Sequence, residues 1–170
     1  MATGDRIDIV APQRFVTENG SLTMSPLRVV GGVAGFAMAK QDNSGFQFTT
    51  RVPTNGTPLS TGLTFQVLLV DDPNNSDPGK VARFGVTVKK LASGTDDLTQ
   101  TGAGTETAGN ATMNATSGVV TALSLAVTTA NADSPSAGDL LLVRIRRIGS
   151  NAADTHRGVP LVLQVTVSDT

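Results

Sequence analysis

The segments DLLLVRIRRI at residues 139–148 and VPLVLQVTVS at residues 159–168 decide the fold class. In both segments apolar side chains occupy every second position, and this period of two is typical of a β-strand with one buried face. The apolar phase contains Leu141, Val143, Ile145, Leu161, Leu163, Val165 and Val167. The segments are separated by GSNAADTHRG, which is rich in turn-forming residues. The pattern therefore predicts two strands joined by a loop.

The same alternation recurs upstream, at residues 62–70, 80–90 and 119–128, and more weakly at 46–52 and 106–116. Turn residues fill the stretches at 71–79 and 131–138, which we therefore interpret as loops. So many short strands of period two predict an all-β, antiparallel, jelly-roll-like β-sandwich. Its predicted core contains Phe65, Val67, Phe84, Val86, Leu125, Val143, Ile145, Leu163 and Val165, with Ala111 and Met113 as small inward residues.

Composition supports the same class. The chain has 12 Asp against 2 Glu, and 9 Arg against 4 Lys, so the charged residues that favour helix surfaces are scarce. There is no Cys, which excludes a scaffold that depends on disulfides. At 170 residues the chain is long enough to bury a core by itself.

The first 40 residues lack a continuous strand or helix period and are interrupted by Gly31, Gly32 and Gly35. We expect residues 1–40 to form an extended N-terminal arm, with a short helical turn near 34–40, and residues 41–170 to form the sandwich domain. The arm is expected to add little to the domain's own fold and to serve assembly.

The sequence is poorly supplied for catalysis. His156 is the only histidine, and its neighbour Asp154 would point elsewhere in an extended loop, so we expect a solvated or interface histidine. The stretch DDPNNSD at 71–77 offers oxygen ligands, but it lacks the glycine and the distant glutamate of a helix-flanked calcium loop. We predict no enzyme activity, no catalytic or metal site and no cofactor, and the Asx-rich stretch is interpreted as a turn.

Nucleic acid and membrane partners are not expected. The net charge is −1, and alternation splits the cluster at 144–147, which sends Arg144 and Arg146 to one face and Arg147 to the other. The N-terminal segment has no signal-peptide pattern, and no apolar run reaches the length of a membrane helix. With neither Trp nor Tyr in the chain, any glycan site would have to be polar.

Two strands are apolar on both faces. Leu68 and Val70 lie opposite the core phase of residues 62–70, and Leu140 and Leu142 do so in residues 139–148. An uncovered face of this kind would exceed what a monomer usually exposes, so we expect a second cover from the arm or from another subunit, in a symmetric homo-oligomer. The interface candidates are Leu68, Val70, Leu140, Leu142, Ile7, Ile9 and Phe15.

Residues 137–167 contain a G-D-L-x-x-x-R-x-x-R-x-G strand, then a loop with D-T-x-x-G, and then a last apolar strand. The residues at the fixed positions are Gly138, Asp139, Leu140, Arg144, Arg147, Gly149, Asp154, Thr155 and Gly158. With this pattern the segment resembles the closing strands of a jelly-roll module found in virion proteins of tailed bacteriophages.

The resemblance implies a structural module of the virion, made in the host cytoplasm. We expect a capsid decoration or cement protein that binds the major capsid protein and stabilises its lattice. The choice of a trimer comes from this resemblance, because a trimer matches the local three-fold positions of an icosahedral lattice. The alternative is a tail or fibre module that binds a host-surface glycan, while the missing acid–base residues disfavour a polysaccharide-degrading enzyme.

Overall fold

Ten β-strands make up the fold in the computed structural model, which describes residues 7–9, 27–30, 33–40, 44–52, 61–91 and 104–169. That part of the chain contains no helix, so none is long and apolar enough to span a membrane. The strands are β1 (Ile7–Ile9), β2 (Leu27–Val30), β3 (Val33–Ala37), β4 (Gly45–Arg51), β5 (Gly62–Asp71), β6 (Val81–Leu91), β7 (Thr107–Thr112), β8 (Thr121–Thr128), β9 (Leu140–Arg147) and β10 (Pro160–Asp169).

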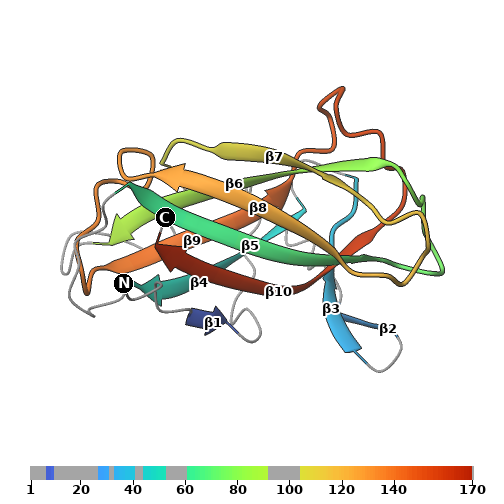
Figure 1. The fold of residues 1–170 in the computed structure, drawn as a ribbon, viewed down its shortest axis with the longest axis horizontal. Helices are drawn as coiled ribbons and strands as arrows, with labels where there is room; N and C mark the ends of the chain where they lie inside the picture. The colour runs from blue at the N-terminus through green and yellow to red at the C-terminus, as the bar shows by residue number, and fades with distance from the viewer. Residues whose placement is uncertain are drawn as a thin grey trace.

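The strands form two antiparallel sheets that pack face to face (Figure 1). One sheet has six strands in the order β2-β3-β10-β5-β8, with β1 also paired to β10, and the other has the order β4-β9-β6-β7. From β4 to β10 the chain passes repeatedly from one sheet to the other, so most pairings join strands that are distant in sequence. This arrangement confirms the predicted all-β, jelly-roll-like antiparallel sandwich.

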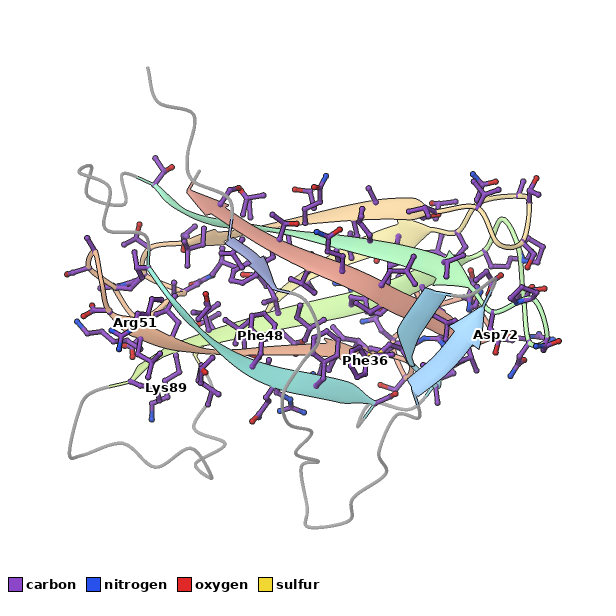
Figure 2. All side chains as sticks on the ribbon, turned by 90° about the horizontal axis from the view of Figure 1, so that it is seen from below. Phe36, Phe48, Arg51, Asp72 and Lys89 are labelled. Atoms are coloured by element: carbon purple, nitrogen blue, oxygen red, sulfur yellow. The ribbon has the colours of Figure 1, made fainter. Side chains whose placement is uncertain are left out.

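The core lies between the two sheets and is built from the inward phase of each long strand. Phe65 and Val67 of β5 and Phe84 and Val86 of β6 are all completely buried. The Phe46 ring lies between the rings of Phe36 and Phe48, with centroid separations of 5.4 Å and 6.1 Å. Figure 2 shows Phe36 and Phe48 inside the layered structure. The predicted core is confirmed except at Leu163.

Leu163 lies outside the main core because β10 has an irregularity there. The pairing of β10 with β5 shifts between Val162 and Gln164, so one residue of β10 has no partner on β5. Such a bulge reverses the phase of alternation on one side of it. Val162 joins the core in place of Leu163, which packs with Leu161 in a smaller cluster.

The end of the predicted arm belongs to the sandwich. Residues 33–37 form β3 instead of the predicted helical turn, and Ala37 and Phe36 pair with Leu161 and Val162 of β10. Phe36 and Met38 are part of the main core. Strand pairing and the burial of two large side chains, Phe36 and Met38, therefore account for a strand where a helical turn was predicted.

Candidate functional site

A buried polar cluster lies at one end of the sandwich, where the loop between β9 and β10 folds back over both sheets. It contains Arg147 at the end of β9, Asp154 and His156 in the following loop, and Asp71 at the end of β5. All four side chains are almost completely inaccessible to solvent. Because β9 and β5 belong to different sheets, the cluster connects the two layers.

Arg147 is the centre of this cluster, and each of its five N–H groups has an acceptor. Nε and Nη2 donate to the two carboxylate oxygens of Asp154, both at 2.9 Å. Nη1 donates to the carbonyls of Met38 and Gly158 at 3.1 Å and 2.8 Å, and Nη2 also donates to the carbonyl of His156. The forked, two-point pairing with Asp154 is the geometry that a guanidinium favours with a carboxylate.

Asp154 extends the cluster toward β6 and the end of β3. Its Oδ2 accepts a hydrogen bond from the backbone N–H of Arg83 at 3.1 Å. Its backbone carbonyl accepts one from Nζ of Lys40 at 2.9 Å. The adjacent Thr155 hydroxyl accepts from the N–H of Val81 at 3.1 Å. The loop is thus held to the start of β6 at two successive points.

His156 is fully buried, which corrects the expectation of a solvated or interface histidine. Nε2 lies 3.1 Å from Oδ1 of Asp71, and because a carboxylate only accepts, Nε2 is the donor. Nδ1 faces Nη2 of Arg147 at 3.5 Å. Asp71, the acceptor of the ring, is 85 residues away in the sequence, so the residues around His156 do not indicate that it is buried. The ring is held inside the cluster, with no open side toward solvent.

The Asx-rich stretch behaves as the predicted turn. Oδ1 of Asp72 accepts from the N–H of Asn74, and Oδ2 of Asp71 accepts from the N–H of Asp77. Asp77 in turn accepts from the N–H of Arg157 at 2.8 Å, which joins this turn to the β9–β10 loop. Among the residues that the structure describes, no group of three or more potential ligands is placed to hold a metal ion.

Gly158 lies where the two loops touch. A Cβ at this position would come within 2.3 Å of the carbonyl oxygen of Asn75 and 2.9 Å of the His156 ring. Only glycine allows the backbones to approach this closely. The loop conformation therefore depends on the absence of a side chain at residue 158.

The turn that precedes β9 is held in a similar way. Gly138 has a φ of 84°, and its N–H donates to the carbonyl of Val52. Asp139 accepts from the N–H of Ser136 at 2.7 Å and pairs with Nζ of Lys90 at 2.8 Å. The hydrogen bond from Lys90, followed by that from Ser136, lowers the pKa of Asp139 below its usual 3.8. Most residues that carry the sequence resemblance thus hold the two connections that flank β9.

The structure separates the predicted interface residues. Val70 is buried against Ala37 and Leu161 of the same chain, and Leu142 is also buried, at 9% exposure. Leu68 and Leu140 are half-buried. Val70 therefore has its second cover within the chain, where Ala37 of β3 and Val70 flank Leu161 in register.

The remaining interface candidates lie in the N-terminal region. Ile7 and Ile9 are in β1, in register with Val167 and Val165 of β10. Phe15 lies outside the described residues. Leu68, Val70, Leu140 and Leu142 do not form one fully exposed apolar patch. The physical argument for an oligomer therefore loses part of its support. The homotrimer stays a prediction.

Comparison with known proteins extends the fold description. No family model matches the sequence, and no curated protein matches it. Among solved structures, a xylan-binding module, CBM15, is similar with a TM-score of 0.50 and 13% identity, over 98% of this chain and 97% of that one. A cycloisomaltooligosaccharide glucanotransferase from Paenibacillus sp. is matched with a TM-score of 0.42 and 13% identity, over 96% of this chain but 18% of the enzyme. At this identity the first likeness indicates a shared sandwich architecture.

Proposed function

We propose that the chain is a non-catalytic structural protein of a tailed-bacteriophage virion, a decoration protein that binds the major capsid lattice and stabilises it. The observation that supports this proposal most is the burial of the polar side chains at the end of β9 and in the loop that follows it. Arg147, Asp154 and His156, which could have served chemistry, are buried and bonded to one another and to backbone groups. These residues stabilise a rigid module, as expected of a protein whose task is mechanical.

The proposed mechanism is the bridging of neighbouring capsid subunits by a stiff sandwich. The buried cluster fastens both sheets at one end, so a load applied to one sheet is passed to the other through Arg147 and Asp71. Each contact can be weak, because a lattice presents many copies and multivalent attachment multiplies modest affinities. A homotrimer at the three-fold positions remains part of this proposal.

The test is the thermal stability of tailless heads of the phage that encodes the chain, with and without the protein. We expect heads that carry the protein to release their DNA at a higher temperature. The reason is that a protein that binds the assembled lattice and not the dissociated subunits stabilises the assembled lattice. Equal release temperatures, with the protein shown to be bound, would contradict the decoration role. Light scattering on the purified chain checks the trimer separately.

A glycan-binding module of a tail or fibre is the second candidate. The likeness to a xylan-binding module over nearly the full length of both chains is the observation in its favour. Every phenylalanine that the structure describes is buried in the core. None of these rings is therefore available to stack on a sugar, so binding would depend on polar side chains. Retention of the chain on insoluble xylan or on cells of the host, competed by soluble polysaccharide, would support this candidate.

A further inference from the structure

β8 is an edge strand of the six-stranded sheet: among the strands that the structure describes, it pairs with β5 and with no other. Just beyond the two strands, the N–H of Thr129 donates to the carbonyl of Thr61. Only alternate residues of an antiparallel strand bond to a given neighbour, so the register makes the odd-numbered residues of β8 the ones bonded to β5. The N–H and C=O groups of Ala122, Ser124 and Ala126 therefore point away from β5, and all of these residues are exposed.

The other sheet ends on the same side of the sandwich. β7 is an edge strand of the four-stranded sheet. It lies against β8, because a Cβ on Gly109 of β7 would come within 2.5 Å of Cδ2 of Leu125 and 3.3 Å of Cδ1 of Leu123. Figure 1 shows β7 and β8 together along one side of the molecule. We call this side the β7–β8 rim.

The β7–β8 rim lacks the features that normally protect a sheet edge. Residues 107–132 contain no charged residue and no proline, and β8 pairs with β5 over its whole length without a bulge. The other edge strands each contain a charge, Asp8 in β1, Arg28 in β2 and Arg51 in β4. Unprotected edges accept further strands, because their backbone groups are unpaired. An eight-residue edge strand without protection therefore indicates that β8 has a partner.

Apolar side chains continue the β7–β8 rim at the start of β8. Val119 and Val120 are 43% and 50% exposed, and they are the large apolar side chains that the described part of the chain leaves open to solvent. Exposed apolar residues that are scattered singly need no explanation. Two adjacent valines at the end of an unpaired strand instead place apolar surface beside free backbone groups, and strand pairing would cover both.

We infer that the β7–β8 rim binds a second copy of this chain, with β8 pairing antiparallel to β8 of that copy across a two-fold axis. Like residues meet around such an axis, so charged edges would repel one another, and an edge without charge does not. The rim also offers no charge by which a different protein could be selected. A second copy presents both edges at the same separation, so one contact continues both sheets. This inference is independent of the decoration role, and a two-fold contact does not replace the three-fold one of the predicted trimer.

The free part of the β8 edge ends before Thr128. The carbonyl of Thr128 accepts from the N–H of Ala132 at 3.0 Å, and its hydroxyl accepts from the N–H of Asn131 at 3.3 Å. The turn after β8 thus occupies the groups that Thr128 would offer to another strand. The backbone groups available for pairing extend from Ala122 to Ala126.

These limits fix the register of the proposed pair. Ser124 is in the middle of the free part, so pairing is complete when Ser124 faces Ser124 of the second copy. Ala122 then faces Ala126, and each facing pair exchanges both of its backbone hydrogen bonds. Val120 lies across from Thr128 of the second copy, where its exposed side chain is covered.

The experiment uses the absence of cysteine from the chain, which makes an introduced thiol unique. In the proposed pair, the Cα atoms of Ser124→Cys lie about 5.5 Å apart across the axis. A disulfide spans Cα separations of about 4.4–6.8 Å. Ala152→Cys, exposed in the loop between β9 and β10, is the matched control. Both folded variants are oxidised under the same mild conditions, and covalent dimers are followed on non-reducing gels.

We expect Ser124→Cys to form dimers roughly tenfold or more faster than Ala152→Cys, because pairing raises the effective concentration of the thiols. Ala122→Cys alone and Ala126→Cys alone should be as slow as the control, since the two thiols would lie roughly 14 Å apart along the strands. A mixture of these two variants should form mixed dimers rapidly. Equal rates for Ser124→Cys and Ala152→Cys would overturn the inference, and rapid dimers of Ala126→Cys alone would overturn this pairing.

Amide hydrogen exchange on the unsubstituted chain tests the pairing without a thiol. The N–H groups of Leu123 and Leu125, which bond to β5, should be protected at every protein concentration. Those of Ala122, Ser124 and Ala126 should become protected only as the concentration rises. Protection of these amides only when tailless phage heads are added would assign the edge to a strand of a capsid protein and overturn the second copy. The decoration role would stand in either case, because the release temperature of the heads tests it separately.

Discussion

Arg147 is a buried cation whose charge is balanced by Asp154, and both side chains are fully inaccessible. Breaking a buried pair by removing one partner leaves an uncompensated charge, and this is usually more damaging than losing both. The pair is therefore the residue-scale feature on which the closing loop most depends.

Replacing Arg147 by Met should lower the free energy of unfolding by about 3–5 kcal/mol, because Asp154 would stay buried without its partner. The double variant Arg147→Met with Asp154→Leu should be more stable than the single one, since no buried charge remains. Urea unfolding measures both, with Arg157→Met, at an exposed site, as the control. A double variant less stable than the single one would contradict this account.

Asp139 provides a prediction about pH. Its pKa is lowered chiefly by the hydrogen bond from Lys90, so Lys90→Met should raise it toward the ordinary value of 3.8. The pKa of Asp139 in the folded protein lies below that value, so the ionised carboxylate stabilises the fold. This contribution is present above pH 3.8 and is lost as the pH falls through the lowered pKa. A carboxyl carbon NMR titration of both chains measures the change. An unchanged pKa in the variant would show that Lys90 is not the main cause.

At the scale of single elements, β5 begins at a glycine with no room for a side chain. Gly62 has a φ of 150°, and a Cβ there would lie 2.0 Å from the carbonyl oxygen of Val127 on β8. Gly62→Ala should therefore destabilise the protein by several kcal/mol, because the paired backbone cannot move away.

Gly79 is the matched control for Gly62. It has a φ of 73° but no atom within 4 Å of an added Cβ, so Gly79→Ala should lose only about 1–2 kcal/mol through backbone strain. Thermal melting distinguishes the two substitutions. Equal losses would mean that contact with β8 is not what requires glycine at residue 62.

The irregularity in β10 makes a second element-scale prediction. Val165 is in the main core, whereas Leu163 is half-buried in the smaller cluster. Val165→Asp should therefore be strongly destabilising, by about 3 kcal/mol or more, and Leu163→Asp by about 1–2 kcal/mol. Chemical unfolding gives both values. A larger loss at Leu163 would place the register shift elsewhere.

On the scale of the whole molecule, the predicted N-terminal arm is not a single unit. Part of the first 40 residues pairs with the sandwich, and the rest lies outside the described residues. β3 is paired with β10, Met38 is fully buried, and the Met38 carbonyl accepts from Arg147. Residues 33–40 are thus part of the folded unit.

Deleting residues 1–40 should leave a chain that unfolds at a much lower temperature or aggregates, because Phe36 and Met38 leave the core and Arg147 loses an acceptor. Deleting residues 1–32 retains β3 and should be tolerated better. Melting curves of the two truncated chains decide. Equal stability of the two would restore the original boundary at residue 40.

The local sequence by itself determined the long strands, their buried phases and the outward direction of Arg144 and Arg146. Alternation reports directly which side of a strand is apolar, and this holds without knowledge of the partner strand. It predicted the inward positions from Phe65 to Val165, and it placed Arg147 opposite the two outward arginines.

Only the tertiary structure decided what Arg147 meets and where alternation fails. Its cluster contains the carboxylate of Asp154, the carbonyl of Met38 and, beyond His156, Asp71, and Met38 is 109 residues away from Arg147 in the sequence. The bulge at Leu163 and the pairing of β3 with β10 likewise depend on neighbouring strands. The burial of a polar side chain is decided by whether partners converge on it in space, and a linear pattern does not encode that convergence.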